Sequence, residues 1–259
     1  MASDRKNAIV TGASKGVGRG IAVELAGAGW NIGVNYNADE AGAAETVRMV
    51  ENRGGSAWAL QGDIGTSADV ERVFTDFDRL AGRLNLLVNN AGVQTWASLF
   101  DLQEADFDRT IRTNLKGCFL CMKAAAPRMR DAGGGAIVNI GSGANRIPFP
   151  NLGDYCASKG GIDQLTRVAA VEFGPHQIRV NCVAPGAIEI ERTRLEDPDY
   201  AGTWGAVTPI RRVGQVADVA AAVAYLASDE AAFVTGQTLY VDGGLWSQGV
   251  WPYERSEDG

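Results

Sequence analysis

Histidine is almost absent from this sequence, which contains only His176 among its 259 residues. A histidine-rich zinc or iron site is therefore excluded, and a serine–histidine–aspartate triad would have to use that one residue. The surrounding run, Gly-Pro-His-Gln, is typical of a surface loop. We expect a site that holds no metal.

Cysteine and long apolar runs are also scarce. Cys118 and Cys121 lie in an apolar, helix-like stretch, where two small core residues are a better interpretation than a redox pair. Unpaired cysteines suggest a reducing compartment. The longest apolar run, residues 219–227, is far shorter than the ~20 residues of a membrane span, and no apolar signal segment follows the N-terminus. We expect a cytoplasmic protein without a membrane anchor.

Positive charge is in deficit, with 24 lysines and arginines against 31 aspartates and glutamates and a net charge of −7. This balance argues against nucleic acid as a partner. Glycine is abundant, with 33 of 259 residues, which is roughly 13% against a usual share of about 7%. This abundance indicates many tight turns or close backbone approaches. A small-molecule ligand is the expected partner.

Short β-branched segments alternate with longer amphipathic ones along the chain. Strands are expected at residues 8–11, 31–36, 57–60, 84–89, 136–140, 179–184 and 238–241. Helices are expected at residues 18–28, 39–53, 66–81, 104–130, 155–174 and 216–227. This alternation predicts βαβ units and a doubly wound, seven-stranded parallel sheet with helices on both faces. We expect one α/β domain over residues 1–259, with an irregular flap at 189–205 and a C-terminal tail at 245–259.

A glycine-rich loop follows the first expected strand and leads into a helix. Residues 11–18 read TGASKGVG, with glycines at 12, 16 and 18. Gly12, Gly16 and Gly18 would let the backbone approach a pyrophosphate lying against the helix N-terminus, beside Ser14 and Val17. An ordinary turn is the alternative, but the context predicts a dinucleotide site.

Two later strand ends fit the same ligand. Asp63, followed by Ile64, ends the third strand and could accept a hydrogen bond from an adenine amino group. Asn90, Ala91 and Gly92 follow the fourth strand and bring small residues to the carboxyl edge, where such sheets bind ligands.

The end of the second strand lacks the acid that NAD binding usually uses. Tyr36 and Asn37 stand there instead, and Lys15 in the glycine loop could meet a 2′-phosphate. Asp39 could still reach back to a ribose. These features favour NADP(H), with NAD as the open alternative.

Tyr155 and Lys159 lie four residues apart at the start of an expected helix and so share a face. A tyrosine beside an ammonium group is more easily deprotonated and can serve in acid–base catalysis. Ser142 could hold a carbonyl or alcohol oxygen beside the tyrosine, and Asn114 could anchor a water that links Lys159 to solvent. A tyrosine–lysine pair alone is more often ordinary surface chemistry.

In combination, these motifs resemble the short-chain dehydrogenase/reductase family. The set comprises TGxxxGxG at 11–18, NNAG at 89–92, Asn114, Ser142, Tyr155-x-x-x-Lys159 and Pro185-Gly186. The resemblance covers about residues 6–244 and implies a Rossmann fold. It also implies hydride transfer between a nicotinamide and a carbonyl carbon, without a metal.

The resemblance assigns roles to individual residues. Asn114, Ser142, Tyr155 and Lys159 would form the catalytic tetrad, in which the tyrosine moves the proton and the lysine also holds the nicotinamide ribose. A second group would lie along the nicotinamide carboxamide: Pro185, Gly186 and Ile188.

The substrate signals are divided. Residues 34–36, 146–150, 157–161 and 185–188, with a tail beyond residue 244, are similar to bacterial glucose 1-dehydrogenases, although these commonly carry a basic residue where Asn37 stands. Residues 226–232 and 242–244 are equally similar to 3-oxoacyl-acyl-carrier-protein reductases. Those enzymes usually end near Leu245 and dock an acidic carrier with arginines, one of which is replaced by His176 here.

We therefore expect an NAD(P)(H)-dependent oxidoreductase that interconverts a secondary alcohol and a ketone or lactone, acting on a sugar-like or small polar carbonyl compound. A 3-oxoacyl-acyl-carrier-protein reductase is the alternative, and a non-catalytic nucleotide sensor is a minor one. The substrate pocket is expected from residues that follow strand ends or bracket the flap: Gln94, Trp96, Ser142, Asn145, Arg146, Glu189 and Trp204. Polar groups among aromatic walls suit a polyhydroxylated ligand, although each residue could instead face solvent.

The end of the chain is unusually aromatic. Trp246, Trp251 and Tyr253 should be buried on the chain's own surface or on a neighbour. Because members of the resembled family are mostly tetramers, we expect a homotetramer with this tail at a subunit interface near an active site. We also expect the flap at 189–205 to act as a mobile lid.

Overall fold

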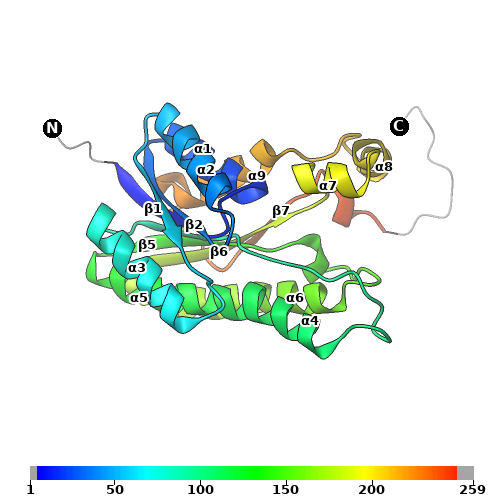
Figure 1. Cartoon of the computed structure of the whole chain (residues 1–259), viewed down its shortest axis with the longest axis horizontal. Coiled ribbons are helices and arrows are strands. Elements are labelled where there is room, and N and C mark those ends of the chain that lie inside the picture. The colour runs from blue at the N-terminus through cyan, green and yellow to red at the C-terminus, as the bar shows by residue number, and fades with distance from the viewer. Residues whose placement is uncertain (1–4, 250–259) are drawn as a thin grey trace.

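The computed structural model describes residues 5–249, and all seven strands in this range join one parallel sheet (Figure 1). The strand order is β3-β2-β1-β4-β5-β6-β7. The strands are β1 (Lys6–Val10), β2 (Trp30–Tyr36), β3 (Ala57–Gln61), β4 (Leu86–Asn89), β5 (Gly135–Ile140), β6 (Ile178–Pro185) and β7 (Thr238–Val241). Each expected strand begins and ends within two residues of an observed one.

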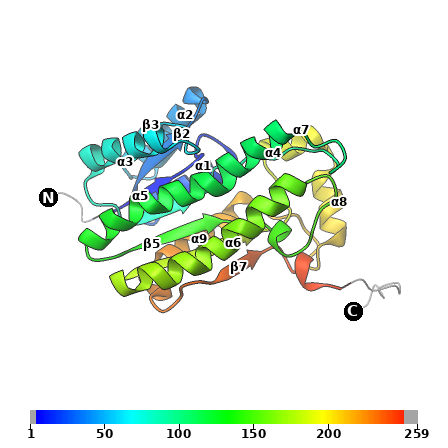
Figure 2. The same cartoon turned by 90° about the horizontal axis from the view of Figure 1, so that it is seen from below.

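Helices cover both faces of the sheet, which confirms the predicted doubly wound architecture. The helices are α1 (Gly16–Gly27), α2 (Glu40–Asn52), α3 (Ser67–Ala81), α4 (Glu104–Thr110), α5 (Gly117–Asp131), α6 (Gly153–Phe173), α7 (Glu191–Glu196), α8 (Tyr200–Val207) and α9 (Val216–Ala227). Figures 1 and 2 show α1, α2 and α9 on one side of the sheet and α3, α5 and α6 on the other. No helix in residues 5–249 combines the length and apolar character that a membrane crossing needs.

The central strand β1 shows why the sequence folds this way. Ala8, Ile9 and Val10 are all fully buried, and successive side chains of a strand point to opposite faces. Ala8 and Val10 belong to the core beneath α1, α2 and α9, whereas Ile9 packs in the opposite core with Phe74 and Phe77 of α3. A strand that is apolar on both faces is stable only inside such a sandwich of helices.

The chain reverses its direction of travel across the sheet next to β1, which lies between β2 and β4. Connections on the two sides of this point leave the sheet toward opposite faces, so a crevice opens at the carboxyl ends of the strands. The glycine loop and the β4 turn both lie at this edge. The fold therefore places the expected binding segments together.

Two local expectations are wrong. The segment 189–205 is not irregular, because it contains α7 and the first part of α8; the Ile190 amide donates to Thr193 Oγ1 over 2.9 Å and caps the first of these helices. The helix expected at 104–130 is interrupted by a π-helical turn, Ile111–Lys116. A π turn accommodates an extra residue in a helix, and such turns occur frequently at functional sites.

Candidate active site

The glycine loop is pressed against the turn that follows β4. Gly12 has φ +60° and Gly16 φ +56°, a region that disfavours side chains. A Cβ at Gly12 would lie 2.8 Å from Ala91 Cα, and one at Gly18 would lie 2.5 Å from the Gly12 carbonyl oxygen. Glycine is therefore required here for the loop, the β4 turn and the start of α1 to meet.

Asn90 locks these two segments together. Its Nδ2 donates to the carbonyls of Thr11 (2.9 Å) and Gly12 (3.1 Å). The amides of Asn90 and Ala91 donate to Thr11 Oγ1 over 2.9 and 3.1 Å. The Asn90 side chain is thus used to hold the loop. Its main partner, Thr11, was recognised as part of the glycine-rich motif but was given no role of its own.

Asp63 lies at the expected edge but has a strong partner of its own. Arg112 Nη1 contacts its Oδ2 at 2.7 Å, and the Gly65 amide donates to its Oδ1 over 2.9 Å. A carboxylate oxygen can accept more than one hydrogen bond, so the adenine contact stays a prediction. Ile64 is 6% exposed and packs where a side chain at Gly117 would lie.

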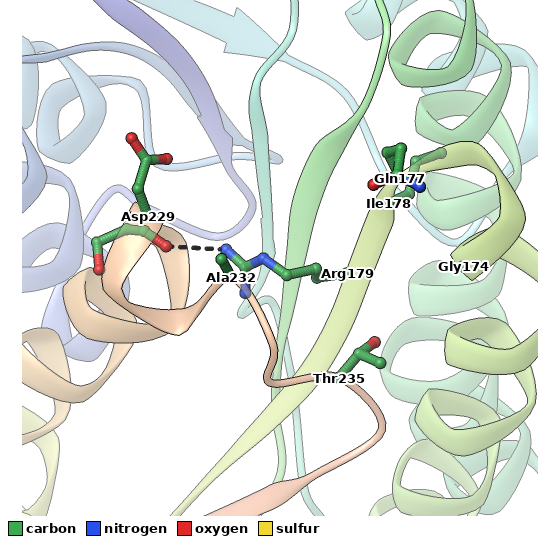
Figure 3. A pocket seen from close by; sticks show the side chains of 8 residues that line it. Gly174, Gln177, Ile178, Arg179, Asp229, Ala232 and Thr235 are labelled. Carbon is green, nitrogen blue, oxygen red and sulfur yellow. Dashed lines mark hydrogen bonds between the residues drawn. The ribbon is translucent and has the colours of Figure 1, made fainter.

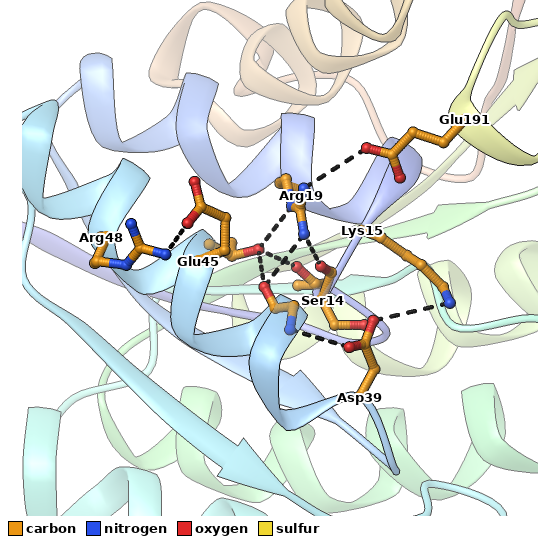
Figure 4. A network of polar contacts seen from close by, with 10 residues as sticks. Ser14, Lys15, Arg19, Asp39, Glu45, Arg48 and Glu191 are labelled. Carbon is orange, nitrogen blue, oxygen red and sulfur yellow. Dashed lines mark hydrogen bonds and ion pairs between the residues drawn. The ribbon is translucent and has the colours of Figure 1, made fainter.

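Charges of both signs meet at the end of β2. Lys15 Nζ lies 3.8 Å from Asp39 Oδ2 (Figure 4). The Gly42 amide donates to Asp39 Oδ1 over 3.0 Å and is the main reason that the pKa of Asp39 is lowered. Tyr36 is buried, and Asn37 is exposed beside it. This corner offers a cation for a phosphate, but an anion lies beside it.

Arg19 of α1 connects three parts of the site, and no sequence pattern pointed to it. Figure 4 shows its guanidinium between the glycine loop, α2 and α7. It donates to the carbonyls of Ser14 and Gly42 and, over 3.1 Å, to Thr46 Oγ1. Its Nη1 lies 3.7 Å from Glu191 Oε1 at the start of α7. The flap is thereby anchored to the predicted cofactor loop.

Asn114 lies within the π-helical turn and is 1% exposed. Its Oδ1 accepts from the Val93 amide at 2.8 Å. Its Nδ2 donates to the Val93 carbonyl (2.9 Å) and to Ser158 Oγ (3.0 Å). Both N–H donors of the amide are consumed, so the side chain joins the β4 turn to α6. Its expected role as a water anchor stays a prediction.

Lys159 and Tyr155 lie together on α6. Lys159 is 4% exposed, and its Nζ donates to the Ile140 carbonyl at the end of β5 over 2.7 Å. The same Nζ lies 5.5 Å from the centroid of the Tyr155 ring. A buried ammonium group needs acceptors for its three donors, and the Ile140 carbonyl takes one of them.

Ser142 follows Ile140 by two residues, so β5 brings it to the same edge as Lys159. Its Oγ accepts from the Ala144 amide over 3.2 Å, and the residue is half-buried. A hydroxyl that accepts in this way can still donate its own proton. A substrate oxygen could receive that hydrogen bond.

The arrangement fits a nicotinamide dinucleotide. A Cβ at Gly16 would come within 4 Å of Ile190 Cδ1 alone among the described residues, at 3.8 Å, so the loop is open there. The buried Lys159 has donors that suit ribose hydroxyls. On the other side of the crevice, the Gly186 amide donates to the Val241 carbonyl over 3.0 Å, and a Cβ at Gly186 would lie 2.8 Å from Asp242 Cα. Ile188 is buried beside Gly214. Pro185, Gly186 and Ile188 therefore form a closely packed wall.

Two of the predicted substrate residues, Gln94 and Glu189, are bonded to arginines of α7. Oriented with its oxygen toward the donors, the Gln94 amide accepts from Arg192 Nη1 (3.1 Å) and Trp96 Nε1 (2.9 Å). Glu189 accepts from Arg194 (3.0 Å) and Gln215 (3.2 Å), so its carboxylate stabilises the base of the flap.

Asn145 and Arg146 both contact Tyr240 of β7. The tyrosine hydroxyl donates to Asn145 Oδ1 over 3.1 Å, and the Arg146 guanidinium lies 5.7 Å from the ring centroid. Trp204 of α8 packs among other aromatic rings, 6.3 Å from Trp246 between centroids. A substrate contact stays a prediction for all three predicted residues.

A separate cavity lies at the opposite end of β6. It has a volume of about 290 Å³ and is lined by residues that include Ile178, Arg179 and Thr235 (Figure 3). The Arg179 guanidinium donates to the carbonyls of Leu226 (2.8 Å) and Ser228 (3.1 Å), and burial lowers its pKa. We interpret this cavity as structural, because the Arg179 guanidinium holds the chain after α9.

The fold and the site together define a nicotinamide-dependent oxidoreductase of the Rossmann type. Comparison with known proteins leads to the same class. The family described as Enoyl-(Acyl carrier protein) reductase matches residues 12–246. The 3-oxoacyl-acyl-carrier-protein reductase of Staphylococcus aureus (strain Mu50) is 38% identical over 241 residues, covering 93% of this chain and 98% of the relative. The 3beta-hydroxysteroid dehydrogenase 1 of Eggerthella lenta is 39% identical over 243 residues, covering 93% of each chain.

A solved structure extends this similarity to three dimensions. Gluconate 5-dehydrogenase from Burkholderia cenocepacia J2315, in complex with NADP and tartrate, superposes with a TM-score of 0.88 at 34% identity, covering 94% of this chain and 96% of that one. The chain belongs to the short-chain dehydrogenase/reductase family, near the 3-oxoacyl-acyl-carrier-protein reductase type. It is an NAD(P)-dependent oxidoreductase.

Proposed function

We propose that this enzyme interconverts a secondary alcohol and a ketone or lactone, with Tyr155 as the acid–base group. The observation that carries the proposal is the buried Lys159, fixed by Ile140 at 2.7 Å and lying 5.5 Å from the Tyr155 ring. The Tyr155 hydroxyl is the group that can give or take a proton, and the ammonium group of Lys159 lies beside its ring.

The residues have separate tasks. When bound, the nicotinamide cofactor supplies or accepts the hydride at the substrate carbon. In ketone reduction Tyr155 donates its phenolic proton to the substrate oxygen, and in alcohol oxidation it accepts that proton. Ser142 donates a hydrogen bond to the same oxygen, and Lys159 binds ribose hydroxyls. Asn114 is a positioning residue, because its bonds hold the π turn against α6.

NADP(H) is the preferred cofactor in this proposal. Lys15 is exposed at the corner beside Asn37, where a 2′-phosphate would find a cation, and the similar gluconate 5-dehydrogenase was solved with NADP. The Asp39 carboxylate beside Lys15 favours NAD instead, so NAD remains a second cofactor. The glycine loop, Asn90–Gly92 and Asp63–Ile64 would hold the rest of the dinucleotide.

The proposed substrate is a sugar-like or small polar carbonyl compound. Gln94 and Arg192 supply polar groups where the segment after β4 meets α7, and gluconate 5-dehydrogenase is among the similar structures. A 3-oxoacyl thioester is the second candidate, favoured by the 38% identity to a 3-oxoacyl-acyl-carrier-protein reductase. The chain's net charge of −7 weighs against an acidic carrier as the partner.

We also propose a cytoplasmic homotetramer. Apolar side chains are exposed on α5 and α6, among them Phe119 (45%), Val168 (44%) and Val171 (78%), which is typical of a surface that another subunit covers. Trp251 and Tyr253 of the aromatic tail lie outside the described residues. Trp246 packs against its own chain.

A substrate and cofactor screen tests the proposed function. The purified enzyme would be assayed for NADPH and NADH oxidation with ketones and an acetoacetyl thioester, and for the reverse reaction with sugars and polyols. We expect turnover of a sugar or small polar compound, with higher kcat/KM for the phosphorylated cofactor. Turnover of the thioester alone would support the second candidate, and turnover of none would contradict both.

A further inference from the structure

Four aromatic rings form a connected group that reaches Gly143, the residue after Ser142, and we call Phe149, Tyr200, Trp204 and Trp246 the aromatic wall. The ring centroids of Phe149 and Trp246 lie 5.1 Å apart at 72°, and those of Trp204 and Trp246 lie 6.3 Å apart at 74°. Tyr200 and Trp204 are 6.1 Å apart. Rings that meet nearly edge to face form an angular surface rather than a flat stack. All four residues are only half-buried.

Three separate segments contribute to the wall. Phe149 follows β5, Tyr200 and Trp204 belong to α8, and Trp246 lies in the 3₁₀ turn Leu245–Ser247 after β7. Figures 1 and 2 both show α8 beside the segment that follows β7. Since these segments are distant in the sequence, their meeting at the catalytic edge is a tertiary feature that periodicity does not reveal.

Gly143 brings Trp246 directly against the catalytic loop. A side chain at Gly143 would collide with the indole ring, at Nε1, Cδ1 and Cε2. Asp242 fixes the turn by accepting from the amides of Gly244 and Trp246, each over 2.9 Å. The indole is therefore held on the residue next to Ser142, whose hydroxyl is proposed to bind the substrate oxygen.

The wall offers the substrate an apolar surface. Trp246 Nε1 is buried against Gly143 and has no acceptor among residues 5–249, so the accessible part of this indole is its carbon framework. Burial raises the pKa of Tyr200 to about 12, which keeps its phenol neutral. The Arg192 guanidinium acts on Tyr200 and donates to the Gln94 amide, so polar groups border the wall at its Tyr200 end.

We infer that the aromatic wall determines substrate specificity by binding the C–H face of a ring-shaped substrate, with Trp246 and Trp204 as the contacting residues. This inference rests on the proposed oxidoreductase function and adds the shape of the substrate. An alicyclic ketone and a pyranose both carry such a face. A small acyclic ketone covers little of the wall and gains little from it.

The test compares ring and acyclic substrates in the full-length enzyme and in two variants, Trp246→Ala and Trp246→Phe. The probes are 4-methylcyclohexanone for the alicyclic class, glucose for the pyranose class and butan-2-one for the acyclic class. Trp58→Phe is the matched control, since Trp58 lies in β3 and packs on Phe77. Thermal unfolding and native mass of every variant would be measured alongside the kinetics.

We expect Trp246→Ala to lower kcat/KM for at least one ring probe by roughly tenfold, mainly through KM, and for butan-2-one by less than about threefold. Trp246→Phe should lie between Trp246→Ala and the unmodified enzyme, and Trp58→Phe should keep the original ring preference. The ring probe that loses more in Trp246→Ala identifies the class, alicyclic or pyranose.

Two results would overturn the inference alone. In the first, the unmodified enzyme turns over the ring probes, and Trp246→Ala keeps the same ratio of kcat/KM between ring and acyclic probes. The other is an equal loss for all probes with a changed native mass, which would make Trp246 an interface residue. If the unmodified enzyme turns over none of the ketones, sugars, polyols or thioester of the substrate screen with either cofactor, the proposed function falls and the inference with it.

Discussion

Asn114 donates from Nδ2 to Ser158 Oγ over 3.0 Å, and Ser158 in turn donates to the carbonyl of Tyr155 over 2.8 Å. This relay connects the π-helical turn to the first turn of α6, which carries the proposed acid–base residue. It gives Asn114 a positioning role that depends on its bonds to Val93 on one side and Ser158 on the other.

Asn114→Ala should lower both stability and activity. It leaves the Val93 amide and carbonyl and the Ser158 hydroxyl without their buried partner, which should cost about 2–3 kcal/mol in the free energy of unfolding. Ser158→Ala removes only one of these bonds and should cost about 1 kcal/mol. Urea unfolding and kcat/KM would be measured for both variants. If Asn114→Ala and Ser158→Ala lose the same amount of unfolding free energy and of kcat/KM, the positioning role of Asn114 is contradicted.

Lys15 and Asp39 should act in opposite directions on cofactor preference. Lys15→Ala removes the cation proposed to meet a 2′-phosphate and should lower kcat/KM for NADPH about tenfold more than for NADH. Asp39→Asn removes the neighbouring anion and should raise the NADPH to NADH ratio. Initial rates with both cofactors check this, and a ratio unchanged in both variants would show that neither group meets the phosphate.

Arg19 should control the order of the flap. Glu191→Gln breaks only the 3.7 Å contact to α7 and should speed amide hydrogen exchange in α7 while leaving α2 unchanged. Arg19→Lys also weakens the contacts to Gly42 and Thr46 and should speed exchange in α2 as well.

If the flap acts as a lid, saturating cofactor and substrate should slow amide hydrogen exchange across residues 189–205. Unchanged exchange with ligands would contradict a lid.

Three thiols should resist alkylation in the native protein. Burial raises the pKa of Cys118 to about 12 and of Cys182 to about 11, and it raises the pKa of Cys121 further. Their thiolate forms are therefore scarce until the pH approaches those values, and reactivity should rise only in strong alkali or after unfolding. Cys156 is half-buried and should be modified first. Iodoacetamide labelling followed by peptide mass spectrometry from pH 7 to 9 checks this order, and rapid labelling of Cys118 would contradict it.

The sheet could be predicted from the sequence because each strand is itself short and apolar. Val34 and Val138, for example, lie in runs whose side chains are buried on both faces, and such runs have a local signature. The π turn at Asn114 was not recognised, because a shift of one residue is hard to distinguish in a pattern that repeats every 3.6 residues.

The remaining features depend on contacts between residues that are distant in the sequence. Arg19 meets Glu191 across the crevice, and Trp246 meets Phe149 across almost a hundred residues. Motif spacing placed Tyr155 and Lys159 on one helix face, but the anchor of the lysine at the Ile140 carbonyl could only come from the folded chain.

The most direct test of the central claim, that Tyr155 transfers the proton with the support of Lys159, is the turnover of Tyr155→Phe. The variant keeps the aromatic ring and removes only the hydroxyl, so cofactor affinity measured by fluorescence titration should stay within about threefold, while kcat should fall by roughly a hundredfold or more. If kcat stays within about tenfold of the unmodified enzyme at normal cofactor affinity, another group moves the proton and the account is wrong.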